Sequence, residues 1–296
     1  MKMKLFLLPV TMLFAVVTPS KAQTESPFDS VQQIKEVVIS TTRIPEMKSN
    51  AAASVTIIDH NQIAAMAKIA PDMSKLLGLL TPGMALSSNT TSSRSQSLRG
   101  RSALILIDGI PQSTPLRSTD RDIRTIDVSA IDHIEVVKGS TALYGNGAIG
   151  GLINIITKKD VTGKSIAGQT SLSGSTYNFF RQKRGQGYRL NQQLYGTVGK
   201  FDYLVNGAFG RTGSSVDGSG QFISPRYGLG DTYTTNALVK LGYALSPKNR
   251  LEFMYNFYRS LQDTKLIPSA GKYLEKPAIG ILGNKDPQAV DEGTRY

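Results

Sequence analysis

The stretch Ile131–Lys159, IDHIEVVKGSTALYGNGAIGGLINIITKK, is the most informative part of this sequence. Two runs of β-branched residues, IEVV and LINII, flank a segment with five glycines between Gly139 and Gly151. Val and Ile favour pleated, half-buried strands, whereas Gly allows positive-φ turns and close approach between backbones. The stretch therefore predicts two strands joined by a Gly-rich connection.

The spacing Gly145-x-Gly147-x-x-Gly150 also matches the dinucleotide-binding fingerprint. That site needs a helix after the glycines and an acidic residue about 20 positions further on, within a βαβ unit. The residues that follow, LINIITKK, are short and β-branched, which is typical of a strand. A nucleotide-binding site is therefore not expected here.

The sequence motif in this stretch, IEVVKG…YG.GAIGG.INIITK, occurs together with a second motif, Leu98-Arg99-Gly100 followed by LILIDGIP (Leu104–Pro111). Over most of Glu36–Lys159 the sequence resembles the plug domain of TonB-dependent outer-membrane receptors. The resemblance implies an α+β plug domain at residues 51–160, followed by an antiparallel transmembrane β-barrel of about 22 strands. It also implies a structural plug signature: Arg99, Gly100, Asp108, Gly109, Gly139, Gly145, Gly147, Gly150 and Gly151.

Several local patterns predict the elements of the plug domain. Alternating or wholly apolar runs predict strands at Ser54–Ile58, Leu104–Ile107, Ile134–Val137 and Leu152–Ile156. Helix-capping residues predict two short helices, one from Asp59–Asn61 through Ala67 and one over Asp72–Leu80. Asp108-Gly109 predicts a tight turn after the apolar strand.

The N-terminus has the layout of a secretory signal peptide at residues 1–22, with Lys2 and Lys4 ahead of the apolar run Leu5–Val17 and small residues before position 23. We expect export to the outer membrane of a Gram-negative bacterium. Residues 23–50 form a flexible polar tail with one β-prone run. The resemblance implies that this run is a TonB box, which binds the TonB protein by adding a strand to its sheet. Its residues are Glu36, Val37, Val38, Ile39, Ser40 and Thr41.

Composition excludes several kinds of chemistry. The chain has no cysteine, which excludes disulfides, thiolate metal sites and cysteine catalysis. Its two histidines, His60 and His133, lie in no metal-ligating spacing. We therefore expect no enzyme, no metal site and no cofactor, with iron present only as part of a ligand. The 34 basic and 22 acidic residues are spread along the chain, which suits a lumen that attracts anions and predicts no nucleic-acid partner.

From Ser165 onward, segments of about ten residues alternate between apolar and polar positions. Leu251, Phe253, Tyr255 and Phe257 share one face, and Lys240 and Gly242 oppose an apolar face on the segment before it. Long polar connections alternate with short turns, as in a transmembrane barrel with lipid around it.

Residues 161–296 predict about five such strands, then an irregular stretch after Ser260 without a barrel-strand pattern. About 135 residues follow the plug, too few for about 22 strands of 9–11 residues. We therefore expect a fragment of a longer receptor or a truncated gene, and we expect that this chain does not transport by itself.

The resemblance implies uptake of a scarce ligand driven by TonB, with the plug gating the barrel. Thr125–Lys159 is most similar to ferric siderophore receptors of the aerobactin or hydroxamate type. Haem, cobalamin or a glycan as ligand, and a barrel that binds or conducts without TonB, remain as alternatives. The expected ligand contacts lie in plug loops and the first outer loop, unless the arginines pair with acids of the barrel wall instead: Arg94, Arg117, Arg121, Tyr177, Phe179 and Phe180.

Overall fold

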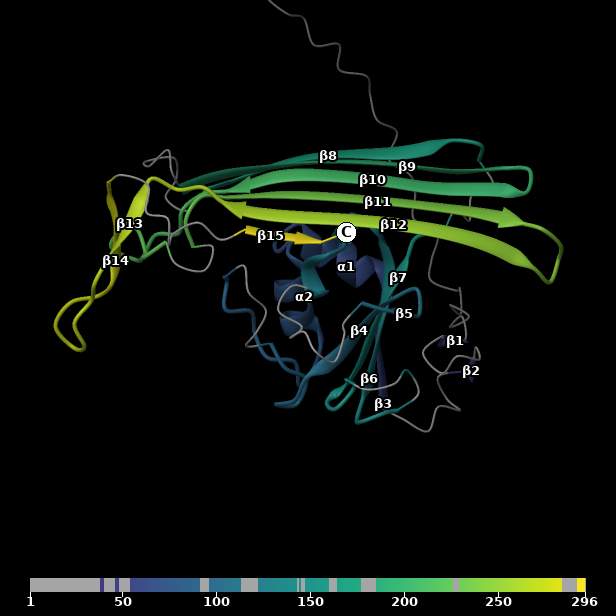
Figure 1. Ribbon diagram of the computed structural model, residues 1–296, viewed down its shortest axis with the longest axis horizontal. Helices are drawn as coiled ribbons and strands as arrows, with labels where there is room; N and C mark the ends of the chain where they lie inside the picture. The colour runs from purple at the N-terminus through teal and green to yellow at the C-terminus, as the bar shows by residue number, and fades with distance from the viewer. Residues whose placement is uncertain are drawn as a thin grey trace, which may run out of the picture. The chain divides into compact units, whose positions relative to one another are not determined.

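The protein is described by a computed structural model. It describes residues 54–90, 96–112, 123–142, 144, 147–159, 164–176, 185–225 and 229–283 in full, and the backbone alone of 38–39, 46–47, 122 and 292–295. Val37–Tyr296 form one compact unit. Its strands fall into two large sheets and two short pairs (Figure 1).

The plug domain is built on a five-stranded mixed sheet in the order β3-β6-β7-β4-β5. Only β4 and β7 pair in parallel, and the other neighbours are antiparallel. All four predicted strands are present, and the short β5 joins them. The strands are β3 (Ser54–Ile58), β4 (Ala103–Ile107), β5 (Ile110–Pro111), β6 (Ile131–Lys138) and β7 (Gly151–Thr157).

Two helices precede β4, as the capping residues predict. Helix α1 (His60–Ala67) begins after Asp59, whose side chain forms a capping box with Gln62. Helix α2 (Met73–Leu80) begins one residue later than predicted, because Asp72 is its N-cap and accepts from the backbone of the first turn. Two 3-10 turns, η2 (Asp122–Arg124) and η3 (Val128–Ala130), lead into β6.

The Gly-rich connection joins β6 to its antiparallel neighbour β7, so strands flank it on both sides as predicted. A strand after the glycines is incompatible with a dinucleotide site. The last two glycines lie where no side chain fits: a Cβ on Gly150 would be 2.6 Å from the Leu98 carbonyl oxygen, and one on Gly151 2.2 Å from that of Val137. The connection therefore closes by direct contact between backbones.

Two turns of the plug domain adopt positive φ at signature residues. Arg99 and Gly100 have φ of 55° and 76°, and Asp108 and Gly109 have φ of 49° and 81°. Positive φ at both central residues is the pattern that Asp-Gly favours in tight hairpins. The second turn joins β4 to β5 and carries the Asp108 carboxylate past the end of a fully buried strand.

The second large sheet, which we call the long sheet, has six antiparallel strands in the order β15-β12-β11-β10-β9-β8. Strands β9 to β12 are 12 or 13 residues long, enough to cross a bilayer at a tilt. The strands are β8 (Ala167–Thr176), β9 (Gln186–Val198), β10 (Phe201–Thr212), β11 (Thr232–Ala244), β12 (Arg250–Gln262) and β15 (Glu292–Arg295).

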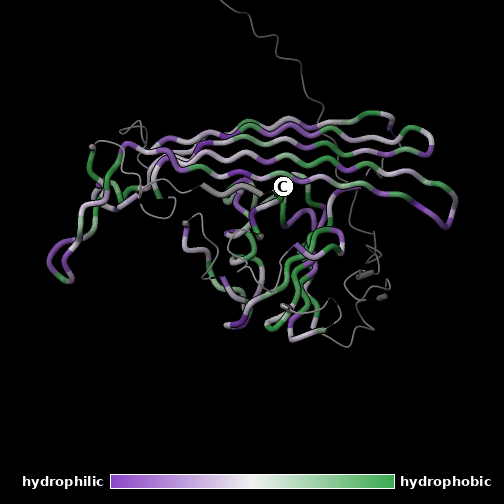
Figure 2. The backbone as a smooth tube through the Cα atoms, viewed as in Figure 1, coloured by the Kyte–Doolittle hydropathy of each residue, from purple (hydrophilic) through white to green (hydrophobic). Residues whose placement is uncertain are grey.

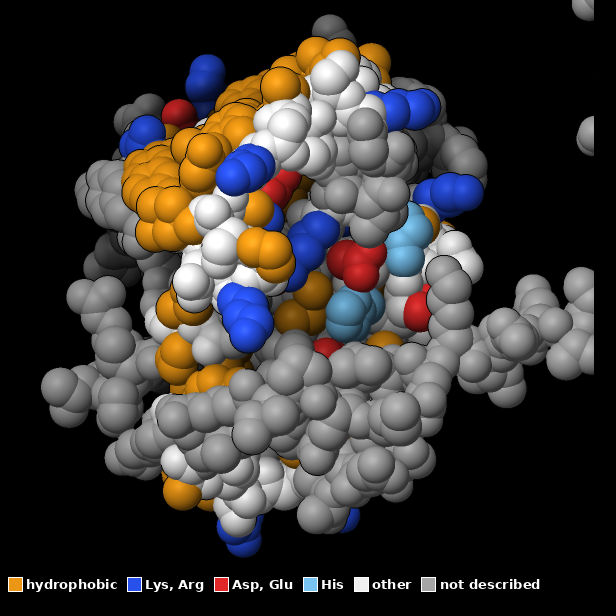
Figure 3. Space-filling model, turned by 90° about the vertical axis from the view of Figure 1, so that its right-hand side faces the viewer, with side chains coloured by type: hydrophobic (Ala, Val, Ile, Leu, Met, Phe, Trp, Pro, Cys, Tyr) orange, Lys and Arg blue, Asp and Glu red, His pale blue; other side chains and the backbone are white. Residues whose placement is uncertain are grey.

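The two faces of the long sheet differ in character, and hydropathy alternates along its strands (Figure 2). One face exposes large apolar side chains, such as Leu251 at 64% and Leu172 at 78%. In an end view these hydrophobic side chains form a band over the sheet (Figure 3). The opposite face buries polar residues, including Gln193 and Asn206. This is the lipid-out, polar-in arrangement of a transmembrane barrel wall.

The connections of the long sheet also follow the prediction. Val198 and Phe201 are joined by two residues, and Ser246–Asn249 close a short turn between β11 and β12. At the other end, residues 213–231 form the long connection between β10 and β11. No helix in the described part of the chain is long and apolar enough to span a membrane.

The stretch after Ser260 is more ordered than predicted. Strands β13 (Leu266–Ser269) and β14 (Ile279–Leu282) form a hairpin, where an irregular segment was expected. Glu292–Arg295 pair with the free edge of β12 as β15, although their sequence has no barrel-strand pattern. The open edge of β12 supplies backbone partners, so pairing here does not depend on the intrinsic preference of the residues.

Candidate functional site

The polar face of the long sheet covers the plug domain, and we call this contact the seam. Polar side chains from β9, β10 and β11 are buried here, with Gln193 0% and Lys240 5% exposed. Burying such groups is costly unless each finds a hydrogen-bond partner. Four of them and the half-buried Arg189 find theirs on the plug domain, and we call these five residues the donor strip: Arg189, Gln193, Asn206, Asn236 and Lys240.

We call the end of the seam nearer the long connections of the long sheet its upper part. There the plug domain makes contact through the segment around η3. Asp127 caps this turn, because its Oδ1 accepts from the Ser129 backbone N at 2.9 Å and from the Ser129 hydroxyl at 2.6 Å. Its other oxygen, Oδ2, forms an ion pair with Arg189 of β9. One buried carboxylate thus orders the plug segment and ties it to the long sheet.

Three amide side chains extend this contact. Asn206 Nδ2 donates to Ser129 Oγ at 2.9 Å, and Gln193 Nε2 donates to the Ser129 carbonyl at 3.1 Å. Asn236 Nδ2 donates to the carbonyl of Thr125 at 2.8 Å. Neighbouring strands therefore each hold the η3 segment through its backbone or a small hydroxyl.

The lower part of the seam is an ion pair between Lys240 of β11 and Asp108 of the β4–β5 turn, with Nζ 2.7 Å from Oδ2. Lys240 Nζ also donates to Thr157 Oγ1 at 2.9 Å. Asp108 accepts from the Thr157 backbone N at 2.9 Å and from its hydroxyl at 2.6 Å. We call this three-residue contact the latch, because it joins one turn and one strand end of the plug to the long sheet.

Apolar contact at the seam is small by comparison. Leu204 and Leu238 point inward and join the plug core, with Tyr195 and Met254 packed beside them. Burial of two leucines is worth about 3–6 kcal/mol, before any cost of ordering is subtracted. The seam is therefore held by polar as well as apolar contacts, and water or another ligand can replace the polar ones.

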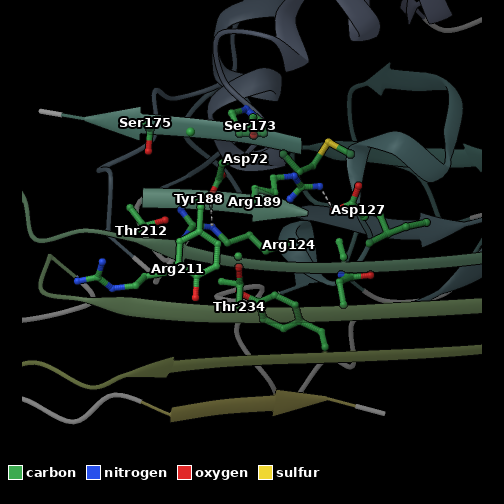
Figure 4. A pocket seen from close by; sticks show the side chains of 18 residues that line it. Asp72, Arg124, Asp127, Ser173, Ser175, Tyr188, Arg189, Arg211, Thr212 and Thr234 are labelled. Atoms are coloured by element: carbon green, nitrogen blue, oxygen red, sulfur yellow. Dashed lines mark hydrogen bonds and ion pairs between the residues drawn. The ribbon is translucent and has the colours of Figure 1, made fainter. Parts of the chain in front are cut away.

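A cavity of about 180 Å³ lies at the upper end of the seam (Figure 4). Arg124 and Asp72 line it from the plug domain, and Arg189, Arg211 and Asn236 from the long sheet. A second cavity of about 340 Å³ shares Asp72 and Arg124 with the first. Together they form a recess, lined by both charged and apolar side chains, that ends beside the η3 segment.

The arginines of this recess each have a carboxylate partner. Arg124 Nε is 3.6 Å from Asp72 Oδ2, and Arg211 Nη2 is 2.6 Å from Asp231 Oδ1. Arg189 pairs with Asp127, as Figure 4 shows by a dashed line. The positive charge of each of these three arginines is therefore balanced by a carboxylate.

His133 lies apart from the seam, on β6 between two carboxylates. Its Nδ1 is 2.7 Å from Asp132 Oδ2 and its Nε2 is 3.5 Å from Glu135 Oε1. Figure 3 shows histidine and acidic side chains gathered on one end of the molecule. Hydrogen bonds to Asp132 and then Glu135 raise the pKa of His133 from 6.5 to about 9, although burial opposes the shift. The described residues contain no metal-binding cluster of three or more acidic, histidine or cysteine side chains.

The raised pKa of His133 predicts a pH-dependent contribution to stability. The charged form is favoured in the folded state, so its contribution is complete below about pH 6.5 and is lost as the pH rises through about 9. We expect His133→Gln to lower the melting temperature of the purified protein at pH 6, and the difference from wild type to shrink by about pH 10. A difference that stays constant across this range would contradict the assignment.

The structure describes only some of the predicted site residues. All six predicted ligand contacts, Arg94, Arg117, Arg121, Tyr177, Phe179 and Phe180, lie outside the described residues, as do Gly145 and Glu36, Val37, Ser40 and Thr41 of the TonB box. Val38–Ile39, the rest of that box, form β1 and pair with β2 (Glu46–Met47). The roles assigned to these residues stay predictions.

The seam residues were missed by sequence reasoning, although part of the signal was present. Asp108 was predicted as a turn residue and as part of the structural plug signature, yet it also binds Lys240. Lys240 was placed correctly on the polar face of its strand, and an inward lysine in a barrel strand is a sign of an acidic partner in the lumen. Nothing in the sequence pairs the two, because they are 132 positions apart.

Comparison with known proteins agrees with this architecture. Residues 47–152 match the family model of the TonB-dependent receptor plug domain. The rhizobactin receptor of Rhizobium meliloti (strain 1021) is 31% identical over 254 residues, which cover 80% of this chain and 32% of that protein. The ferric aerobactin receptor of Klebsiella pneumoniae is 34% identical over 122 residues, which cover 41% of this chain and 16% of that protein.

A solved structure shows the same fold. The ferripyoverdine receptor of the Pseudomonas aeruginosa outer membrane superposes with a TM-score of 0.53 at 20% identity, over 76% of this chain and 28% of that one. This chain spans about a third of the length of the rhizobactin receptor. The plug domain and the antiparallel strands after it agree with these similarities: residues 47–152 match the plug domain of TonB-dependent receptors, and the chain is similar to receptors for rhizobactin and ferric aerobactin.

Proposed function

We propose that this protein takes up a ferric siderophore across the outer membrane, driven by the TonB protein, with the plug domain as the gate. The proposal includes export by a signal peptide at residues 1–22 and location in a Gram-negative outer membrane. The observation that carries it is a plug domain docked on the polar face of a transmembrane sheet by hydrogen bonds and ion pairs.

The chemistry of the seam suits a gate. A hydrogen bond between neutral groups contributes about 0.5–1.5 kcal/mol net, and one to a charged group about 1.5–3 kcal/mol. Such contacts can be broken one at a time and taken over by water, whereas an apolar interface of equal area would resist wetting. A mechanical pull can therefore loosen the plug without unfolding the barrel wall.

The TonB box supplies the point at which force would be applied. Val38 and Ile39 already pair with a second short strand, so this segment can adopt the extended form. Exchange of that partner for a strand of the TonB protein would transmit force through main-chain hydrogen bonds. The names of its relatives, which include receptors for rhizobactin and ferric aerobactin, support a ferric siderophore as the cargo.

Iron-limited growth tests the function directly. Cells that lack the gene should fail to grow on at least one of ferric rhizobactin, aerobactin or enterobactin, and the chromosomal gene should restore growth. A gene without Glu36–Thr41 should restore binding of the siderophore but not its uptake. Growth equal to wild type on every siderophore would refute the iron assignment, and full uptake without the segment would favour a barrel that does not need TonB.

A further inference from the structure

A carboxylate and an amide are buried side by side in the five-stranded sheet of the plug domain. Glu135 of β6 and Asn154 of β7 are direct cross-strand partners and are 1% and 0% exposed. Asn154 Nδ2 donates to Glu135 Oε2 at 3.3 Å. A buried carboxylate is costly unless positive charge or hydrogen-bond donors compensate it, so the amide stabilises Glu135 where it lies.

A second partner of Glu135 reaches the surface. His133 Nε2 is 3.5 Å from Glu135 Oε1, and the His133 side chain is 26% exposed. The same ring contacts Asp132 through Nδ1 at 2.7 Å, so its positive charge is shared between two carboxylates. The donation from Asn154 therefore supplements a compensation that His133 provides only in part.

The oxygen of the Asn154 amide faces the turn between β4 and β5. Asn154 Oδ1 accepts from the Gly109 backbone N at 2.9 Å. An ionised carboxylate can only accept and a backbone N–H can only donate, so the amide is oriented from both ends. The next residue of β7 adds a second contact to the turn, because the Ile155 carbonyl accepts from the Asp108 backbone N at 2.9 Å.

This turn carries the latch. Asp108 and Gly109 both have positive φ, and the turn places the Asp108 carboxylate between Thr157 and Lys240. A buried ion pair stabilises a contact only when its geometry is good, so a shift of the turn would weaken the pair with Lys240. Hydrogen bonds and one ion pair thus link the surface of β6 to the latch. We call the residues of this chain of contacts the relay: His133, Glu135, Asn154 and Gly109.

The relay begins one strand from the edge of the sheet. β3 is the outermost strand on this side and pairs with β6, where Ile57 lies directly opposite Glu135. β3 is also the first strand of this sheet along the chain, after the segment that contains β1 and β2. Separation of β3 from β6 would therefore uncover Glu135 before it reached the strands that hold the latch.

We propose that Glu135 and Asn154 are positioning residues for the latch: they hold the β4–β5 turn so that Asp108 meets Lys240, and disturbance of Glu135 releases this contact between the plug domain and the long sheet. The role rests on the gating function proposed above and names the residues of the plug domain that regulate it.

Exchange of the acid and the amide tests the relay with side chains of nearly unchanged size. Asn154→Asp places a second carboxylate beside Glu135, and at about pH 8 the two either repel each other or must take up a proton, which favours local opening. Glu135→Gln together with Asn154→Asp reverses the pair, so that an amide again donates to a carboxylate that can accept from Gly109. Asn249→Asp, in an exposed turn of the long sheet, makes the same change of charge and is the matched control.

Amide hydrogen exchange in the purified protein reports both ends of the contact. The Gly109 N–H reports its bond to Asn154. The Thr157 N–H, which donates to Asp108 Oδ1 at 2.9 Å, reports the position of the latch carboxylate. The Gly150 N–H donates to a backbone carbonyl at 2.7 Å just before the opposite end of β7 and is the internal reference.

We expect Asn154→Asp to accelerate exchange at Gly109 and Thr157 about tenfold relative to Gly150, because a hydrogen bond to a charged group is lost on opening at little cost. The double variant should return both rates to within about twofold of wild type, and Asn249→Asp should change neither. If Asn154→Asp does not fold, Glu135→Gln alone, which adds no charge, should raise both rates about threefold.

Three results would overturn the positioning role. Faster exchange at Gly109 with an unchanged rate at Thr157 would show that the relay ends at the turn. Equal acceleration at Gly150 would show that β7 as a whole is loosened, and a double variant that exchanges like Asn154→Asp would show that the pairing of acid and amide is irrelevant. The measurement uses neither a siderophore nor the TonB protein, so failure of the uptake function and failure of the relay are seen separately.

Discussion

Replacement of Gly151 by alanine should prevent the plug domain from folding. Gly151 has a φ of 139°, which residues with a side chain rarely adopt, and this costs about 1–3 kcal/mol. A Cβ there would also lie 2.2 Å from the Val137 carbonyl oxygen and 2.9 Å from a Leu98 methyl group. Neither can retreat, because Val137 pairs with Leu152 in the sheet and Leu98 is fully buried.

Two further glycines separate the causes of this effect. Gly139 has a φ of 111°, but no neighbouring atom lies within 4 Å of the place a Cβ would take, so Gly139→Ala bears the cost of the φ alone. Gly207 has neither problem, and Gly207→Ala should be neutral. Trypsin digestion of purified receptor should show the plug cleaved fastest in Gly151→Ala, more slowly in Gly139→Ala and at the wild-type rate in Gly207→Ala. Equal rates for the first two would show that backbone contact plays no part.

These glycines illustrate how far the sequence determines the plug. β-branched runs and capping residues predict β3, α1, α2 and β7 to within one or two residues, because local preference and final environment agree. The need for glycine at Gly150 and Gly151 was predicted from the resemblance and from the general backbone freedom of glycine. The neighbours that impose it, Val137 in β6 and Leu98 in the turn before β4, are set by tertiary contacts and could not be read from the sequence.

The long sheet shows a similar division. Alternation predicts five strands and which face each side chain occupies, because a side-chain period of two is fixed by strand geometry. β15 was missed because four residues, Glu292–Arg295, carry too little pattern, and the edge of β12 supplies the pairing. The seam was missed for a further reason: Asn206 and Asn236 look like ordinary lumen residues until the plug segment that they bind is placed beside them.

Loss of the latch cation should weaken the docking of the plug domain along the whole seam, including the η3 segment. Lys240→Met leaves the Asp108 carboxylate in a largely buried position, where Thr157 is its remaining side-chain partner among the described residues. Removing one partner of a buried ion pair costs about 3–5 kcal/mol, and we expect about 2–3 kcal/mol here because Asp108 keeps two hydrogen bonds. Local opening of the seam should therefore become about 30- to 150-fold more frequent.

Because the chain has no cysteine, a single introduced thiol can report this opening. Ala130→Cys places it in η3, at a position fully buried in the seam, and labelling by a membrane-impermeant thiol reagent measures how often the segment is exposed. Lys240→Met should raise the labelling rate by the factor above. Adding Asp108→Asn to the Lys240→Met chain should bring the labelling rate most of the way back to that of the parent, because an amide tolerates the loss of the cation better than a carboxylate does. If the thiol in the Lys240→Met chain is labelled no faster than in the parent, the η3 contacts alone hold the plug domain against the long sheet, and the ion pair between Lys240 and Asp108 contributes nothing to this docking.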